Sequence, residues 1–384
     1  MERFDVAVVG AGPAGSMTAY RLARAHARVL LIDRARFPRD KPCGGGLTLR
    51  AVKELPFSVD PVVEDVVTRV TCRLRYGPSF DRTGREALCL MTQRRRLDHF
   101  LAERAQEAGA DFRDGVRVEV ESDTKLRLGG TPVEVDTLVG ADGANGVTAR
   151  TLGLGGDIVP GVALEGNVPH GVVSKDEYRG RMVIELAILA GGYGWIFPKG
   201  DHVNVGVGGW ASEGPHVRAR LRELCTVYGI DPDDVTELRG HRLPLRRPTT
   251  KLGRGRALLV GDAAGLVDPV SGDGIYEAFV SARLAADAIQ ADDLDAYEPT
   301  LRARLDPIAA AGWGAKVALD RFPRAVFAVM RLPVTWRALE KVVTGEVGDP
   351  TATRGVERRA MKLIEALARR AGDPGRAYRT APAA

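Results

Sequence analysis

Residues 5–15 read Asp-Val-Ala-Val-Val-Gly-Ala-Gly-Pro-Ala-Gly, and this stretch decides the fold. A short apolar run ends at Gly10 and a helix-like segment begins at Pro13, so the glycines stand in a turn between a strand and a helix. In such a turn Gly10 permits the tight bend, Gly12 lets a phosphate approach the backbone, and Gly15 lets helix and strand pack closely. Free N–H groups at the start of the helix favour an anion. The stretch therefore predicts a site for the pyrophosphate of a dinucleotide.

The next apolar run, Val29–Ile32, completes a βαβ unit and is followed by Asp33. An acidic side chain at this position accepts hydrogen bonds from the ribose hydroxyls of the adenosine half. The alternative, a glycine-rich turn that binds nothing, does not account for how completely the context of the fingerprint is met. The residues expected to contact the dinucleotide in this unit are Gly10, Gly12, Pro13, Ala14, Gly15, Asp33 and Arg34.

Two later segments have the chemistry to hold the other parts of a flavin dinucleotide. Gly140-Ala-Asp142-Gly143 follows an apolar strand, although an acidic residue before glycine is also common in ordinary turns. Leu259-Val-Gly261-Asp262 leads through a long loop to Gly274-Ile275 and a helix with one apolar face. We expect Asp262 to bind the ribityl hydroxyls. We expect the start of the helix near Gly274 to face the flavin edge, where its dipole stabilises the negative charge that appears on reduction.

These three segments, in this order and at these separations, resemble the p-hydroxybenzoate-hydroxylase-like flavoproteins over about residues 1–290. The resemblance implies FAD as the cofactor. One departure is Gly146, where that family usually has serine, and this departure weakens one expected hydrogen bond. The superfamily includes aromatic hydroxylases, halogenases, quinone oxidoreductases and prenyl reductases, so the fold alone does not decide the reaction.

Two further motifs narrow the resemblance. Pro38-Arg-Asp-Lys-Pro-Cys-Gly-Gly-Gly-Leu47 resembles the PxxKxCGGG signature of geranylgeranyl reductases, and Tyr193-Gly-Trp-Ile-Phe-Pro198 with Gly206-Val-Gly208 resembles their YxWxFP…GxG motif. Arg94, in an Arg-x-x-Leu-Asp pattern, matches the arginine with which that family contacts FAD. With the earlier segments included, the further residues that we expect are, for the cofactor, Cys43, Gly44, Gly46, Arg94, Val118, Asp142, Asp262, Gly274 and Ile275, and, for the substrate, Tyr193, Trp195, Phe197, Gly206 and Gly208.

Ordinary structural roles stay open for the same motifs. The glycines after Cys43 let the backbone pass close to a flat ring, and their amides can bond its edge. Tyr193, Trp195 and Phe197 alternate along a strand and face one way, which suits a long apolar chain but also an ordinary core. Cys43 is either a proton donor after hydride transfer, as a weak catalytic candidate, or a small residue that fills space beside the flavin.

The order of these pieces predicts an α/β protein in which a second domain is inserted in parts into the first. The first is a Rossmann-type FAD-binding domain of the p-hydroxybenzoate-hydroxylase-like kind, and the second is a mainly antiparallel α+β substrate domain. A helical region follows at the C-terminus. The expected boundaries are 1–70, 94–156 and 251–300 for the FAD-binding domain, 71–93 and 157–250 for the substrate domain, and 301–384 for the helical region.

The bulk properties fit a globular enzyme. Of 384 residues, 45% are hydrophobic and 27% are charged. The net charge is +5, and the basic residues are scattered along the sequence, so we expect no nucleic-acid partner. The cysteines form no CxxC pair and the histidines show no ligand spacing, so we expect no metal. Because no signal segment and no run of roughly 18 apolar residues occurs, the expected compartment is the cytoplasm, with peripheral contact at the inner face of the membrane open.

The leading functional hypothesis is a reductase that saturates isolated double bonds of a polyprenyl chain. A hydride from reduced FAD reaches one carbon, and an acid or water protonates its neighbour. We expect NAD(P)H to reduce the flavin by transient docking, with Arg39 and Lys41 as candidate attractors, because no second GxGxxG is present to hold it. The acceptor stays open among geranylgeranyl diphosphate, a prenylated glycerophospholipid, a chlorophyll precursor and the menaquinone tail.

Other functions stay open beside it. The first alternative is an FAD-dependent aromatic monooxygenase. A halogenase is less favoured, because its WxWxIP motif differs from residues 193–198 at two of four positions. A flavin-binding carrier without turnover is a further alternative. Residues 322–336 mix apolar side chains with flanking arginines, which predicts either contact with a bilayer or packing against the substrate domain.

Overall fold

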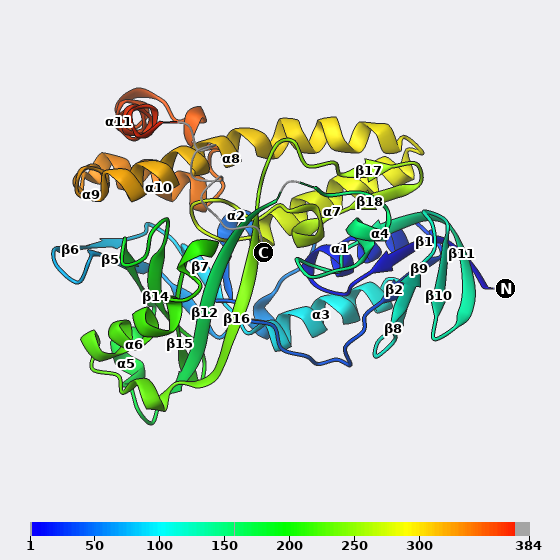
Figure 1. The fold of residues 1–384 in the computed structure, drawn as a ribbon, viewed down its shortest axis with the longest axis horizontal. Helices are drawn as coiled ribbons and strands as arrows, with labels where there is room; N and C mark the ends of the chain where they lie inside the picture. Colours follow the sequence, from blue (N-terminus) through cyan, green and yellow to red (C-terminus); the bar gives the residue numbers. More distant parts are fainter. Residues whose placement is uncertain (1, 157, 373–384) are drawn as a thin grey trace.

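The computed structural model describes residues 2–156 and 158–372, and three β-sheets organise them. The first sheet has eight strands, the second has seven, and a small third sheet has three. The helices of the C-terminal region, coloured yellow to red in Figure 1, run along one side of the molecule beside both large sheets. Residues 373–384 of the expected C-terminal region lie outside the described residues.

The first sheet contains the glycine-rich turn. In order across the sheet its strands are β17 (Gly253–Arg254), β18 (Ala257–Leu259), β11 (Thr131–Gly140), β1 (Glu2–Val9), β2 (Val29–Ile32) and β8 (Asp111–Arg113), and β10 (Lys125–Leu128) and β9 (Val118–Val120) extend from β11. From β18 to β8 every pairing is parallel. Strands that are far apart in the chain therefore end at one edge of the sheet.

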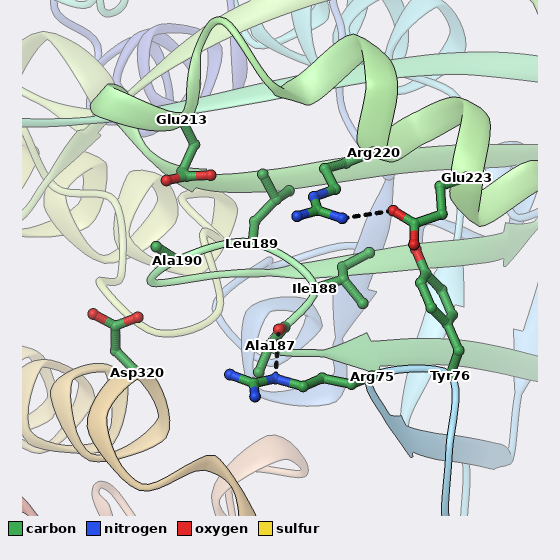
Figure 2. A pocket seen from close by; sticks show the side chains of 10 residues that line it. All are labelled: Arg75, Tyr76, Ala187, Ile188, Leu189, Ala190, Glu213, Arg220, Glu223 and Asp320. Carbon is green, nitrogen blue, oxygen red and sulfur yellow. Dashed lines mark hydrogen bonds and ion pairs between the residues drawn. The ribbon is translucent and has the colours of Figure 1, made fainter.

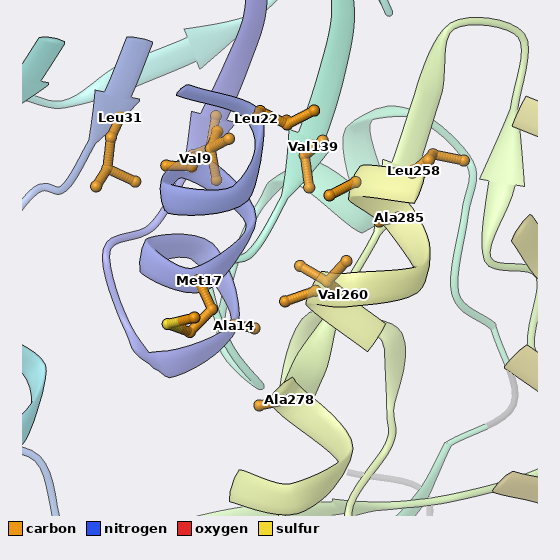
Figure 3. Packing of buried hydrophobic residues seen from close by; sticks show 14 of the residues in the cluster. Val9, Ala14, Met17, Leu22, Leu31, Val139, Leu258, Val260, Ala278 and Ala285 are labelled. Atoms are coloured by element: carbon orange, nitrogen blue, oxygen red, sulfur yellow. The ribbon is translucent and has the colours of Figure 1, made fainter. Parts of the chain in front are cut away.

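Helices α1 (Pro13–Arg24) and α7 (Ile275–Gln290) pack together against this sheet, as Figure 3 shows. Helix α3 (Arg94–Glu107) packs beside α1. The interface is made of small and aliphatic side chains: Met17 and Leu22 of α1 belong to one buried cluster with Val139 of the sheet and Ala285 of α7. Small residues let the two helices approach closely, which brings the turn before α1 near the loop before α7.

The second sheet is mainly antiparallel. In order its strands are β16 (Thr236–Leu245), β12 (Val159–Pro169), β15 (His202–Trp210), β14 (Tyr193–Pro198), β13 (Arg181–Leu186), β5 (Arg69–Leu74) and β6 (Ser79–Thr83). Only β13 and β5 pair in parallel. Helix α6 (Val217–Val227) buries Leu221 and Leu224 in one cluster with Val205 and Val207 of β15. The third sheet has the order β3 (Gly46–Thr48), β7 (Cys89–Met91), β4 (Asp65–Val67).

The C-terminal helices are α8 (Tyr297–Arg321), α9 (Pro323–Met330), α10 (Pro333–Val343) and α11 (Gly355–Ala371). Val326 and Phe327 of α9 are buried in one cluster with Leu74 and Leu186 of the second sheet. The apolar side of α9 therefore packs against this sheet. This packing is one of the two alternatives predicted for residues 322–336. Among the described residues, no helix is both long enough and apolar enough to cross a membrane.

The predicted fold class is confirmed: an α/β protein with a parallel Rossmann-type sheet, a mainly antiparallel second sheet and a helical C-terminal region. The exact domain boundaries stay a prediction. The short elements not yet given are α2 (Leu49–Val52), α4 (Thr148–Thr151), α5 (Lys175–Tyr178), η1 (Asp60–Val62), η2 (Ala211–Glu213), η3 (Pro232–Asp234), η4 (Gly261–Ala264), η5 (Leu294–Ala296) and η6 (Pro350–Ala352).

Candidate flavin and substrate site

The predicted cofactor residues meet at one edge of the first sheet. Gly10 follows β1, Asp33 follows β2, Asp142 comes shortly after β11, and Asp262 comes shortly after β18. These strands are parallel neighbours, so their carboxyl ends lie side by side. In open parallel sheets this is the edge where ligands bind.

The turn between β1 and α1 is closed by backbone contacts. Gly10 has a φ of +105°, and a Cβ added to it would lie 2.3 Å from the carbonyl oxygen of Ala141. A Cβ on Gly15 would lie 1.8 Å from the carbonyl oxygen of Gly10. Pro13 and Ala14 form the buried first turn of α1 between them. Gly10 and Gly15 are therefore required by the packing of the chain itself.

Gly12 differs, because an added Cβ there would make only ordinary contacts, and both are with cationic side chains. A Cβ on Gly12 would have Nη2 of Arg39 at 3.7 Å and Nη2 of Arg94 at 3.9 Å as its nearest neighbours. Arg94 donates from Nε and Nη2 to Asp98 at 2.7 and 2.8 Å, and Arg39 donates from Nη1 to Asp98 at 2.6 Å. Burial alone would raise the pKa of Asp98, but Arg94 and Arg39 lower it overall. Two guanidinium groups beside the backbone of Gly12 fit a pyrophosphate.

Asp33 fixes the turn after β2. Its Oδ2 accepts the N–H of Ala11 at 2.9 Å, and its Oδ1 accepts the N–H of Ala35 at 2.9 Å. An ionised carboxylate has about four lone-pair sites, so capacity for ribose hydroxyls remains. Arg34 is exposed. Val118 begins β9. Two residues before it, Val116 donates its N–H to the carbonyl oxygen of Asp33 at 3.0 Å, so β9 starts close to this turn.

The carboxylate of Asp142 occupies the space that a side chain at residue 146 would need. Oδ2 of Asp142 accepts the N–H of Val147 at 2.7 Å and the N–H and hydroxyl of Thr148 at 2.9 and 2.8 Å. A Cβ on Gly146 would lie 2.1 Å from the carboxyl carbon of Asp142, so a serine here would displace this carboxylate. Among the described residues, Oδ1 of Asp142 is buried without a hydrogen-bond partner, and a buried acceptor of this kind fits a donor on a bound ligand.

Asp262 lies against the start of α7. Its Oδ2 accepts Nζ of Lys41 at 2.9 Å, and a Cβ on Gly274 would lie 3.0 Å from its Oδ1. Burial alone would raise the pKa of Asp262, but Lys41 lowers it overall. Ile275, the first residue of α7, is buried and donates its N–H to Asp273 at 2.9 Å. Lys41 is thus held in an ion pair with Asp262.

The glycine loop, residues Cys43–Gly46, is held by two buried side chains that sequence reasoning missed. The N–H of Cys43 donates to Oε1 of Glu165 at 2.5 Å, and Nζ of Lys199 donates to the carbonyl oxygen of Gly44 at 2.6 Å. Burial raises the pKa of Glu165 to about 7 and lowers the pKa of Lys199 below its ordinary value. The sequence signal for Glu165 is a charged residue inside a mostly apolar strand.

Three aromatic rings form a row on β14 next to the glycine loop. The centroids of Tyr193 and Trp195 are 5.9 Å apart, and those of Trp195 and Phe197 are 6.1 Å apart. A Cβ on Gly44 would lie 2.8 Å from the ring of Phe197. The hydroxyl of Tyr193 donates to the carbonyl oxygen of Ser271, in the loop before α7. The row therefore connects the glycine loop with the loop that precedes α7.

Gly206 and Gly208 stand on β15 opposite Trp195 and Tyr193. A Cβ on Gly206 would lie 2.1 Å from the indole of Trp195, so this glycine makes room for the ring. Trp195 is only 7% exposed and fills a core position, whereas its two neighbours in the row are half-buried. Direct contact of this row with a substrate stays a prediction.

A separate hollow of about 510 Å³ opens beside the second sheet, and Figure 2 shows its lining. Half of its lining residues are charged. Arg220 donates to Glu223 at 2.7 Å, and Arg75 donates to the carbonyl oxygen of Ala187 at 3.2 Å. None of the residues predicted from the sequence lines it. The lining residues are Arg75, Tyr76, Ala187, Ile188, Leu189, Ala190, Glu213, Arg220, Glu223 and Asp320.

The four cysteines are free thiols. Cys72, Cys89 and Cys225 are buried, and Cys43 is half-buried in the glycine loop. Across residues 2–156 and 158–372, no group of three or more His, Cys, Asp or Glu side chains is arranged to hold a metal ion.

Known proteins resemble this chain over most of its length. The FAD binding domain family model matches residues 3–168. Menaquinone reductase of Mycobacterium tuberculosis is 34% identical over 78% of this chain and 79% of its own length. The chloroplastic geranylgeranyl diphosphate reductase of Oryza sativa is 34% identical over 75% of this chain and 67% of its own length.

A solved structure shares the fold. The geranylgeranyl bacteriochlorophyll reductase-like protein from Thermoplasma acidophilum superposes with a TM-score of 0.76 over 96% of this chain and 99% of its own, at 23% identity. At this identity the likeness concerns the fold, and the two reductases above establish the relationship in sequence. The chain therefore belongs to the geranylgeranyl reductase family of FAD-dependent oxidoreductases.

Proposed function

We propose that this flavoenzyme hydrogenates isolated double bonds of a polyprenyl chain carried by a diphosphate, a lipid or a quinone, in isoprenoid or lipid biosynthesis. The observation that carries the proposal is the contact between the aromatic row and the glycine loop, where Phe197 leaves no room for a side chain on Gly44. An apolar row beside this loop suits an alkene chain laid against a flat ring. The names of the two related reductases agree with this class of substrate.

In this proposal FAD lies along the carboxyl edge of the first sheet. Gly12 with Arg39 and Arg94 would hold its pyrophosphate, Asp33 its adenosine ribose, and Asp262 its ribityl chain. Gly274, at the start of α7, then lies by the flavin edge. When bound, FAD supplies the hydride.

The chain itself supplies orientation and the exclusion of water. The row from Tyr193 to Phe197 keeps water from the alkene. Asp98 holds Arg39 and Arg94 in place at the pyrophosphate. The second carbon takes its proton from Cys43 or from water, and Cys43 stays the weaker of the proposed assignments.

NAD(P)H is the proposed electron donor and docks transiently. Lys41 is paired with Asp262 and Arg39 with Asp98. Both cations are already engaged at the proposed FAD site, so neither is available to hold a second nucleotide tightly. We therefore propose a weak complex that forms only for the transfer of electrons.

The test is to release and identify the cofactor by mass, and then to incubate the reduced protein without oxygen with prenyl acceptors. Each saturated double bond adds two hydrogens to the acceptor, which mass spectrometry detects. Phe197→Leu is expected to lower turnover by about tenfold, since it removes the ring beside Gly44. Phe80→Leu is the matched control, because Phe80 packs against Phe327 away from the glycine loop. No mass gain on any prenyl acceptor would contradict the proposal.

An aromatic monooxygenase is the alternative outcome of the same preparation. Rapid mixing of the reduced protein with oxygen and aromatic substrates separates the two functions. Slow reoxidation without ring hydroxylation supports the reductase. Hydroxylation of an aromatic substrate would refute it.

We also propose weak attachment to anionic lipid through the exposed side of α9 and α10. Leu332 is 41% exposed, and Arg321, Arg324, Arg331 and Arg337 around it are exposed. Basic side chains near an anionic bilayer contribute about 1 kcal/mol each at low salt.

Flotation with anionic vesicles at low salt tests this attachment. Wild-type protein is expected to float with the vesicles, and Arg324→Gln/Arg331→Gln to bind at least about tenfold more weakly. The control Arg24→Gln/Arg218→Gln removes the same charge from exposed positions on α1 and α6. An equal loss of vesicle binding in both double variants would show that only net charge matters. If the wild-type protein did not float with the vesicles, the proposed attachment would be wrong.

A further inference from the structure

Lys199 is a buried cation behind the glycine loop. It follows β14, is 3% exposed, and its Nζ donates to the carbonyl oxygens of Gly44 and Thr92, both at 2.6 Å. Hydrogen bonds this short are typical of a charged donor. The ammonium group is thus bound by two backbone carbonyl groups, and the loop has a positive charge at its back.

The middle glycine of the loop makes room for this charge. Gly45 has a φ of +69°, and a Cβ added to it would lie 2.1 Å from Nζ of Lys199 and 2.0 Å from the carbonyl oxygen of Thr92. The N–H of Thr92 donates to the carbonyl oxygen of Gly45 at 2.8 Å, so the backbone here is fixed. A side chain at residue 45 would therefore push the ammonium group away from the loop.

A single peptide group separates Lys199 from Cys43. Lys199 binds the carbonyl oxygen of the peptide between Gly44 and Gly45, and the N–H of the same peptide donates to Sγ of Cys43 at 3.4 Å. This peptide is trans, so its C=O and N–H point in opposite directions. The positive charge therefore lies one peptide group away from Cys43, a residue for which we predict contact with FAD.

Lys199 differs from the other cations of the site in what it binds. Arg94 pairs with Asp98 at 2.7 Å, and Lys41 pairs with Asp262 at 2.9 Å. In each of these pairs a carboxylate compensates the cation directly. The hydrogen bonds of Lys199 go to neutral carbonyl groups, so its charge is compensated less directly.

Two carboxyl groups near Lys199 bind other donors. Glu165 accepts the N–H of Cys43 at 2.5 Å, and Glu64 accepts Nη1 of Arg96 at 3.1 Å. Burial lowers the pKa of Lys199, and Cys43 with both carboxyl groups opposes this lowering. The carboxyl groups therefore favour the charged form of Lys199 without taking its hydrogen bonds.

We propose that Lys199 is a positioning residue whose charge, held behind the glycine loop, favours the reduced form of bound FAD. Negative charge appears on the flavin when it is reduced, and a buried cation nearby stabilises that charge. The inference rests on the proposed function for the place of FAD beside the loop. The place of the cation rests on the contacts of Lys199 alone.

The reduction potential of the bound FAD tests the inference on the purified flavoprotein. Lys199→Gln removes the charge and is expected to lower the affinity for reduced FAD, relative to oxidised FAD, by about tenfold. A unit charge within roughly 10 Å has an effect of this size at the effective dielectric constant of proteins. For a two-electron couple, a tenfold change equals a potential lower by about 30 mV. Equilibration with a redox dye measures it.

The potential separates the charge of Lys199 from its packing. A substitution that only loosened the loop would weaken the binding of both forms of FAD alike and would leave the potential unchanged. Lys199→Met, which keeps a long side chain without the charge, is expected to give the same decrease as Lys199→Gln. If either variant loses FAD during purification, titration of its apoprotein with oxidised and with reduced FAD gives the same ratio of affinities.

Lys316 of α8 provides the matched control. It is 6% exposed, and its Nζ also donates to a backbone carbonyl oxygen, that of Gly191, before the opposite end of β14. Lys316→Gln is expected to keep the wild-type potential. An unchanged potential in Lys199→Gln, or an equal decrease in Lys316→Gln, would overturn the inference. Because the potential is measured without a prenyl acceptor, absence of prenyl hydrogenation would count against the proposed function alone.

Discussion

Replacing Gly10 with alanine is expected to abolish the folded, FAD-bound protein. At φ +105° an L side chain is strained, and the added Cβ would lie 2.3 Å from the carbonyl oxygen of Ala141 and 2.6 Å from its carbonyl carbon. Both are backbone atoms that follow β11, so relief requires moving β11 against β1. A shift between two central strands of the first sheet is expected to cost more than about 4 kcal/mol of unfolding free energy. Soluble yield, the FAD-to-protein absorbance ratio and urea unfolding measure the loss.

Gly109→Ala is the control that separates the cost of backbone strain from the cost of the steric contact with Ala141. Gly109 follows α3 with a φ of +109°, nearly that of Gly10, but a Cβ there would meet nothing within 4 Å. The backbone strain alone is expected to cost about 1–2 kcal/mol and to leave the FAD content unchanged. If the two variants lost equal stability, backbone strain rather than contact with β11 would explain the role of Gly10.

The first sheet could be predicted because its determinants are local. An apolar run that stops at Gly10, a helix that opens at Pro13 and an acid at Asp33 all lie within one βαβ unit, and each step restricts the backbone of the next. Where β18 and β11 stand relative to β1 is not a local property. Their adjacency required the resemblance to known flavoproteins, which linked three motifs that the chain separates.

The buried side chains that hold the glycine loop could not be predicted in the same way. Glu165 and Lys199 act on Cys43 and Gly44 from far along the chain, and no spacing rule connects them. Gly206 shows a different limit of sequence motifs. Its motif predicts a substrate contact, whereas its role in the packing is to make room for Trp195. A motif identifies a region reliably, but the role of each residue in it depends on packing.

Asp98→Asn is expected to be the most damaging change that keeps the shape of a side chain. Asp98 has no exposed side-chain surface and receives hydrogen bonds from Arg94 and Arg39. Removing one partner from a buried ion pair leaves charge uncompensated and costs about 3–5 kcal/mol. The two arginines also lie beside Gly12, where the pyrophosphate is proposed to bind, so FAD affinity should fall by at least about tenfold. Urea unfolding and titration of the apoprotein with FAD measure the two effects.

The pH dependence gives the same substitution a second signature. Because the pKa of Asp98 is lowered in the folded protein, its contribution to stability is present above the ordinary carboxyl pKa and is lost as the pH falls through the folded value. Asp98→Asn should therefore flatten the acid limb of the stability curve. Glu107→Gln, on the same helix, is the control: Glu107 pairs with Arg104 at 2.6 Å but is 56% exposed, so its loss should cost about 0.5 kcal/mol or less. Equal effects of the two substitutions would mean that Asp98 is no more than another surface partner of α3, and that the arginines at Gly12 are held by something else.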